Sequence, residues 1–106
     1  MNKAYTTLLS GTSTSGSNVT ISGKFSSYSL LIFVLTSSSG VNFQKTMVLP
    51  RVLFTNNTNR SLYIWIDNNT NSNLYWSVKY VSDTQIYSSF WADGITGYGG
   101  YIYGIG

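Results

Sequence analysis

At 106 residues the chain is long enough to bury a stable core without disulfides or a structural metal, and we expect a single domain over residues 1–106. It contains no cysteine, histidine or glutamate, which excludes disulfides, thiolate or imidazole metal ligands and histidine-based catalysis. The formal net charge of +3 comes from lysines and arginines scattered along the chain, so nucleic-acid binding, which needs a basic patch, is not expected.

The acidic residues are too few for an ordinary catalytic site. Asp67, Asp83 and Asp93 are the only acids, and general acid-base chemistry needs a positioned carboxylate pair or a histidine. We therefore expect no enzyme, no cofactor and no metal; the weaker alternative is a depolymerase site assembled from carboxylates of adjacent subunits. The chain shows no secretory signal and no apolar run of the ~18 residues that a membrane span needs, so we expect a soluble protein without a membrane partner.

The first half of the chain predicts short strands around one long apolar stretch. Residues 4–9 and 18–22 are expected strands, and in the second of these Val19 and Ile21 alternate toward the interior. Residues 28–36 lack glycine, proline and charge and are apolar on both alternating faces, which predicts a central strand. Because no helix is expected to cover the second face, a neighbouring subunit is a candidate for that role.

The second half begins with a β segment that Pro50 interrupts. Proline lacks the N–H that a strand interior donates, so we expect two strands, 41–49 and 51–54, bent at Pro50. Asn-rich and Asp-containing turns separate the remaining strands, the first two of which should form a hairpin; they are expected at residues 61–67, 74–81, 85–91 and 98–105. The density of glycine in the last segment predicts bulges or the close approach of another backbone.

These seven to nine strands without a credible helix predict an all-β fold. The expected architecture is an antiparallel two-sheet sandwich of jelly-roll-like topology. No repeat of fixed period appears, so a solenoid or propeller is not expected.

Four segments carry a resemblance to a known family. They are Val19-Thr20-Ile21-Ser22-Gly23, Tyr28-Ser29-Leu30-Leu31-Ile32-Phe33, Met47-Val48-Leu49-Pro50 and Tyr101-Ile102-Tyr103-Gly104-Ile105. From about Asn18 onward the chain resembles the C-terminal β-sandwich (tip or head) domains of tail-fibre and receptor-binding proteins from tailed bacteriophages. The resemblance implies a virion protein of the tail or fibre, a homotrimer that contacts other virion proteins and attaches to a host-surface polysaccharide. It supplies no fixed ligand motif, so no residue inherits a binding role.

Aromatic residues provide the candidate ligand site. Aromatic rings stack on sugar rings, while amide, carboxylate and hydroxyl groups bond the sugar hydroxyls. Tyr63 and Trp65 lie on the face of their strand opposite Leu62, Ile64 and Ile66, and the other candidates lie across the hairpin or at a later turn; the full set is Tyr63, Trp65, Tyr75, Trp91 and Asp93. The alternative is that these rings fill the core or an intersubunit seam. Trp76 shares a face with Leu74 and Val78 and is assigned to the core.

Three functions remain open at this point. The first is a trimeric host-recognition module that binds a cell-surface glycan. The second is a purely architectural virion protein, such as a head fibre, a decoration protein or a tail-attached subunit. The third is a free-standing carbohydrate-binding lectin, for which a stable monomer or dimer is expected.

Overall fold

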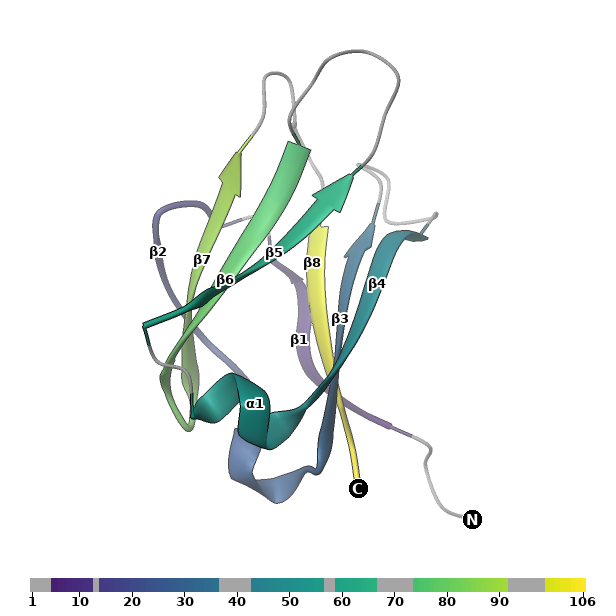
Figure 1. The fold of residues 1–106 in the computed structure, drawn as a ribbon, viewed down its shortest axis with the longest axis vertical. Helices are drawn as coiled ribbons and strands as arrows, with labels where there is room; N and C mark the ends of the chain where they lie inside the picture. Colours follow the sequence, from purple (N-terminus) through teal and green to yellow (C-terminus); the bar gives the residue numbers. More distant parts are fainter. Residues whose placement is uncertain (1–4, 13, 37–42, 57–58, 67–73, 92–98) are drawn as a thin grey trace.

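The computed structural model describes residues 5–12, 14–36, 43–56, 59–66, 74–91 and 99–106, which form two antiparallel sheets packed face to face (Figure 1). The strands are β1 (Thr6–Thr12), β2 (Ser17–Thr20), β3 (Leu30–Thr36), β4 (Phe43–Pro50), β5 (Ser61–Ile66), β6 (Leu74–Ser82), β7 (Gln85–Trp91) and β8 (Gly99–Ile105). One sheet has the order β1-β8-β3-β4 and the other the order β2-β7-β6-β5. The predicted all-β two-sheet sandwich is confirmed.

The strand order combines nested and consecutive pairing. The first strand pairs with the last, and β2 pairs with β7, as in the nested arrangement of a jelly roll. The inner strands instead pair with their sequence neighbours, as the β3–β4 hairpin and the β5–β6–β7 meander. The predicted hairpin between the strands that carry Tyr63 (β5) and Tyr75 (β6) is therefore present, and in it Ile64 lies directly opposite Trp76.

The core lies between the two sheets and follows the alternation of the strands. Leu31, Phe33 and Leu35 of β3 are fully buried, and β3 lies between β8 and β4, which confirms its central position. The facing sheet contributes Trp76, which is also fully buried and was assigned to the core from its sequence pattern. Fully burying a leucine or phenylalanine side chain, as β3 does, stabilises the fold by about 1.5–3 kcal/mol for each side chain.

The second face of β3 is covered in part by the chain itself. Val34 is 4% exposed and Ile32 is half-buried, although both point away from the facing sheet. Tyr101 of β8 lies directly opposite Val34, and Tyr103 lies opposite Ile32. Tyr103 also lines one hollow together with Ile32 and Val34, so side chains of this chain supply part of the cover for which a second subunit is the sequence-based candidate.

The segment after Pro50 is a helix, so the predicted strand over residues 51–54 is wrong. Pro50 ends β4 and is the residue before α1 (Arg51–Thr55), where its φ of −56° suits a helix start. One helical turn directs Phe54 back into the core, where its ring lies 5.2 Å from that of Phe33. A short 3₁₀ turn over Phe25–Ser27 closes the same end of the sandwich as α1 (Figure 1).

Two glycines of β8 make room for aromatic rings rather than for another backbone. A Cβ atom at Gly100 would lie 2.5 Å from the indole of Trp76, and one at Gly104 would lie 2.5 Å from the ring of Tyr28. Both glycines are buried and alternate with the outward-facing Tyr101 and Tyr103. These two glycines thus meet a packing requirement of the inner face of β8, and the register of β1 against β8 also shifts at two points, which fits the predicted bulges.

Candidate functional site

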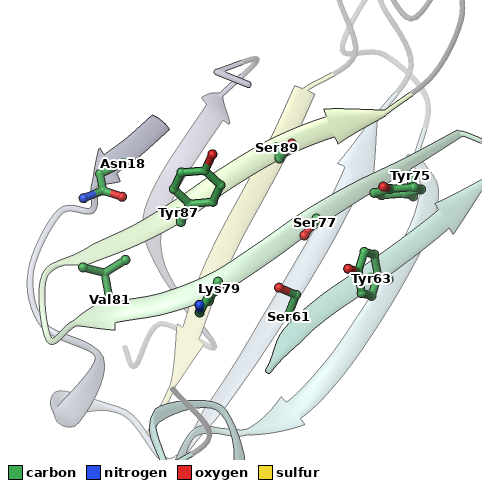
Figure 2. Close-up of a pocket in the computed structure, with 9 residues that line it drawn as sticks. All are labelled: Asn18, Ser61, Tyr63, Tyr75, Ser77, Lys79, Val81, Tyr87 and Ser89. Atoms are coloured by element: carbon green, nitrogen blue, oxygen red, sulfur yellow. The ribbon is translucent and has the colours of Figure 1, made fainter. Parts of the chain in front are cut away.

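The outer face of the β2-β7-β6-β5 sheet carries a groove of about 480 Å³. Four strands contribute its lining, and most of the lining side chains carry a hydroxyl, amide or ammonium group (Figure 2). The lining residues are Asn18, Ser61, Tyr63, Tyr75, Ser77, Lys79, Val81, Tyr87 and Ser89. Because they lie on regular strands, their relative positions are set by the register of the sheet.

Three aromatic side chains form a cluster at one end of the groove, which we call the aromatic corner: Tyr63, Trp65 and Tyr75. Trp65 lies directly opposite Tyr75 in the β5–β6 ladder, and their ring centroids are 4.7 Å apart. Tyr63 meets Tyr75 edge-on at 5.1 Å. Tyr63 and Trp65 are each 46% exposed, so the corner presents aromatic surface to solvent.

A row of small hydroxyl side chains forms the floor beside the aromatic corner. Ser77 of β6 lies opposite Tyr63 on one side and opposite Ser89 of β7 on the other. Figure 2 shows these serines on the floor between the rings of Tyr63 and Tyr75 at one end and that of Tyr87 at the other. The small side chains create the depression, since the larger rings stand on either side of them.

The far end of the groove combines a tyrosine, an amide and a lysine. Along one row of the sheet, Ser61 lies opposite Lys79, Lys79 opposite Tyr87, and Tyr87 opposite Asn18. Tyr87 is 40% exposed and Lys79 is half-buried. This row offers donors and acceptors of hydrogen bonds together with a positive charge.

The acid in the described part of the chain is already hydrogen-bonded to a neighbouring residue. Asp83 lies in the β6–β7 turn and is the only acid among the described residues. Its carboxylate accepts hydrogen bonds from the Ser26 hydroxyl at 2.6 Å and from the Ser26 backbone N–H at 2.8 Å. These two bonds hold the pKa of Asp83 below its usual value, with smaller contributions from the positive charges of Lys24 and Arg51.

The structure brings together three of the five predicted site residues. Tyr63, Trp65 and Tyr75 form the aromatic corner on the outer face, where the alternation of their strands placed them. The backbone of Trp91 pairs with that of Tyr75, but the side chain of Trp91 lies outside the described part of the chain. Asp93 lies wholly outside the described residues.

The sequence pattern alone did not select the polar half of the groove, which comprises Asn18, Ser77, Lys79 and Tyr87. Ser77 and Lys79 share the alternating face of Tyr75 on β6, so a period of two was the available signal. The pairing of Tyr87 with Lys79 follows from the short β6–β7 hairpin, whereas the pairing of Asn18 with Tyr87 depends on the register of strands far apart in the sequence. That register has no local sequence signature.

The outer face of the other sheet is different in chemistry. We define its apolar face by Tyr5, Ile32, Val34, Val48 and Tyr103, around a hollow of about 280 Å³ to which all but Val48 contribute. Val48 is 56% exposed and lies directly opposite Ile32, and the ring of Tyr5 meets that of Tyr103 at 5.1 Å. Burial raises the pKa of Tyr103, with the neighbouring tyrosines acting in the same direction.

Nowhere in the described ranges do three His, Cys, Asp or Glu side chains gather as a metal site. None of the helices in those ranges has the length and apolar character needed to cross a membrane. Comparison of the chain with protein-family models, with curated proteins and with solved structures found no match. What the fold and site define is therefore an antiparallel β-sandwich with an aromatic and hydroxyl-lined surface groove.

Proposed function

We propose that the protein is a carbohydrate-binding β-sandwich and that the groove on the β2-β7-β6-β5 sheet is its binding site. The observation that carries this proposal is the aromatic corner beside a row of serine hydroxyls. A pyranose ring has an apolar face that stacks on an aromatic ring, and a rim of hydroxyls that exchanges hydrogen bonds with side chains such as Ser77. The groove places both kinds of partner within one surface.

The resemblance to phage tip domains supports a more specific role. In this role the protein is a virion component of the tail or fibre, and the groove attaches the particle to a host-surface polysaccharide. Attachment by a shallow site suits a homotrimer, in which three identical grooves act on one polymeric ligand. The activity proposed is binding alone, without cleavage of the glycan.

A glycan-array measurement with purified protein tests the binding role. We expect the wild-type protein to retain a subset of bacterial surface glycans, and Tyr63→Ala to bind them about tenfold more weakly or worse, which corresponds to ~1.4 kcal/mol. The matched control is Tyr63→Phe, which keeps the ring and should keep most of the affinity because stacking, rather than the hydroxyl, is the main contribution. Circular dichroism of both variants checks that the sandwich is intact.

Two results would contradict the proposal. One is the absence of any retained glycan on an array that includes capsular, lipopolysaccharide and teichoic acid structures. The other is binding that Tyr63→Ala leaves unchanged, since the ligand would then lie elsewhere.

A second candidate function is architectural, and the apolar face supports it. Val48 and Tyr5 are each more than half exposed, and the described lining of the hollow beside them is apolar or aromatic apart from Thr46. Exposed apolar patches of this kind commonly mark contacts between proteins. In this role the face binds further copies of the chain, and the protein builds part of the virion without touching the host.

Sedimentation equilibrium distinguishes these roles. A trimer that Val48→Lys converts to monomers would support association through the apolar face, with Val52→Lys as control because Val52 is 47% exposed on α1. A wild-type monomer or dimer would instead favour the free-standing lectin.

A further inference from the structure

We propose that the groove selects an extended, negatively charged oligosaccharide, with Lys79 binding a carboxylate, phosphate or sulfate group of the glycan. This inference rests on the carbohydrate-binding function proposed above and names the ligand class of the same site. It follows from the length of the groove, from its charge and from the position of Lys79 in the sheet.

The groove is longer than a single sugar ring. Tyr75 and Lys79 are four residues apart on β6, and at ~3.3 Å per residue their backbones are about 13 Å apart. Ser77 lies between them on the same face, with Ser89 beside it on β7. A ligand that stacks on the aromatic corner and also reaches Lys79 must therefore be a chain of sugars that runs along β6 over the serine floor.

The lining of the groove carries a positive charge and no negative one among the described residues. Lys79 is the only charged residue among those described in the lining, and its neighbours in the same row are hydroxyl-bearing side chains. The acid closest along the chain, Asp83, is bonded to Ser26 at the end of the sandwich. No described carboxylate is thus available to neutralise the ammonium group within the groove, and an anionic group of the ligand would fill that role.

The position of Lys79 argues against a purely solubilising role. Lysines on edge strands prevent sheets from pairing with other molecules, but β6 lies between β5 and β7 and has no free edge. Lys79 is half-buried on the outer face, between Ser61 and Tyr87 in the same row of the sheet. Its side chain thus lines the groove beside hydroxyl-bearing side chains, a setting suited to a sugar carrying an acidic substituent.

The test is a glycan array that carries matched pairs of acidic glycans and their neutral counterparts, with uronate, phosphate and sulfate groups as separate arms. We expect the wild-type protein to prefer the acidic member of a pair by about tenfold, and the responding arm to identify the anionic group. Lys79→Met, which keeps the length of the side chain, should remove this preference, and Lys79→Arg should retain it. Lys45→Met is the matched control, because Lys45 is exposed on β4 of the other sheet.

The outcomes separate this inference from the function on which it rests. If glycans bind in a manner that Tyr63→Ala abolishes, but neutral and acidic members bind alike and Lys79→Met has no effect, the charge selection is wrong and carbohydrate binding stands. If Lys79→Arg loses binding as fully as Lys79→Met does, recognition of an anion by this charge is contradicted. If no glycan is retained, both proposals fail together.

Discussion

The buried hydrogen bonds of Ser88 permit a quantitative test of the core. Ser88 is fully buried on the inner face of β7; its hydroxyl accepts a hydrogen bond from the Trp76 indole N–H at 2.9 Å and donates one to the Thr14 carbonyl at 2.8 Å. Ser88→Ala removes this oxygen and leaves the indole N–H without a partner in the core. An unsatisfied buried donor costs about 1–3 kcal/mol. We expect Ser88→Ala to lower the free energy of unfolding by about 2 kcal/mol, with the partly buried Thr14 carbonyl adding little.

Urea denaturation followed by circular dichroism measures this change. The midpoint should fall while the slope with denaturant concentration stays constant, since the surface exposed on unfolding is nearly the same. A loss of 2 kcal/mol corresponds to a decrease in Tm of roughly 8 °C for a domain of this size. Ser89→Ala is the matched control: Ser89 is the next residue, faces the groove, and should change stability by less than about 0.5 kcal/mol. Equal effects of the two substitutions would refute the reasoning, because the indole N–H would then have water as a partner.

Two further predictions concern the packing of β8 and the turn beside the groove. Gly100→Ala should destabilise the protein by about 1–3 kcal/mol, because the new Cβ would contact the indole of Trp76. This loss of stability, measured by urea denaturation, should be smaller when Trp76 is also replaced by phenylalanine. Equal losses with Trp76 and with Phe at that position would argue against the contact. Asp83→Asn should lower stability at neutral pH, because the Ser26 hydrogen bonds favour the ionised carboxylate. The depressed pKa means that this contribution is present above the usual value near 3.8 and is lost as the pH falls through the lower folded-state value. The stability difference between wild type and Asp83→Asn should therefore shrink on acidification from pH 7 to about pH 3, and a difference independent of pH over this interval would contradict the assignment.

The strand pattern was predictable because alternation is local. A period of two places Leu62 and Ile64 on one face of β5 and Tyr63 and Trp65 on the other. The hairpin with β6 is then enough to place Tyr75 beside the two aromatic residues. The aromatic corner could therefore be found from two neighbouring segments. Its exposure then followed from the burial of Ile64 on the opposite face.

The remaining features depend on contacts that are distant in the sequence. Four residues after a proline can continue as a strand or make one helical turn, and the choice at residues 51–54 follows from the pocket that Phe25, Phe33 and Tyr80 offer to the ring of Phe54. The place of Asn18 in the groove requires β2 beside β7, a pairing across most of the chain. No pattern of neighbouring residues in the sequence predicts either contact.

The groove and the apolar face lie on opposite sides of the sandwich, because each is the outer side of a different sheet (Figure 1). Copies that associated through Val48 would consequently leave every groove open and directed away from the shared axis. Several weak sites held on one assembly gain avidity for a repeating polymer without any new contact. A sugar-binding surface that is modest in a single subunit would in this way suffice to hold a large particle on a cell.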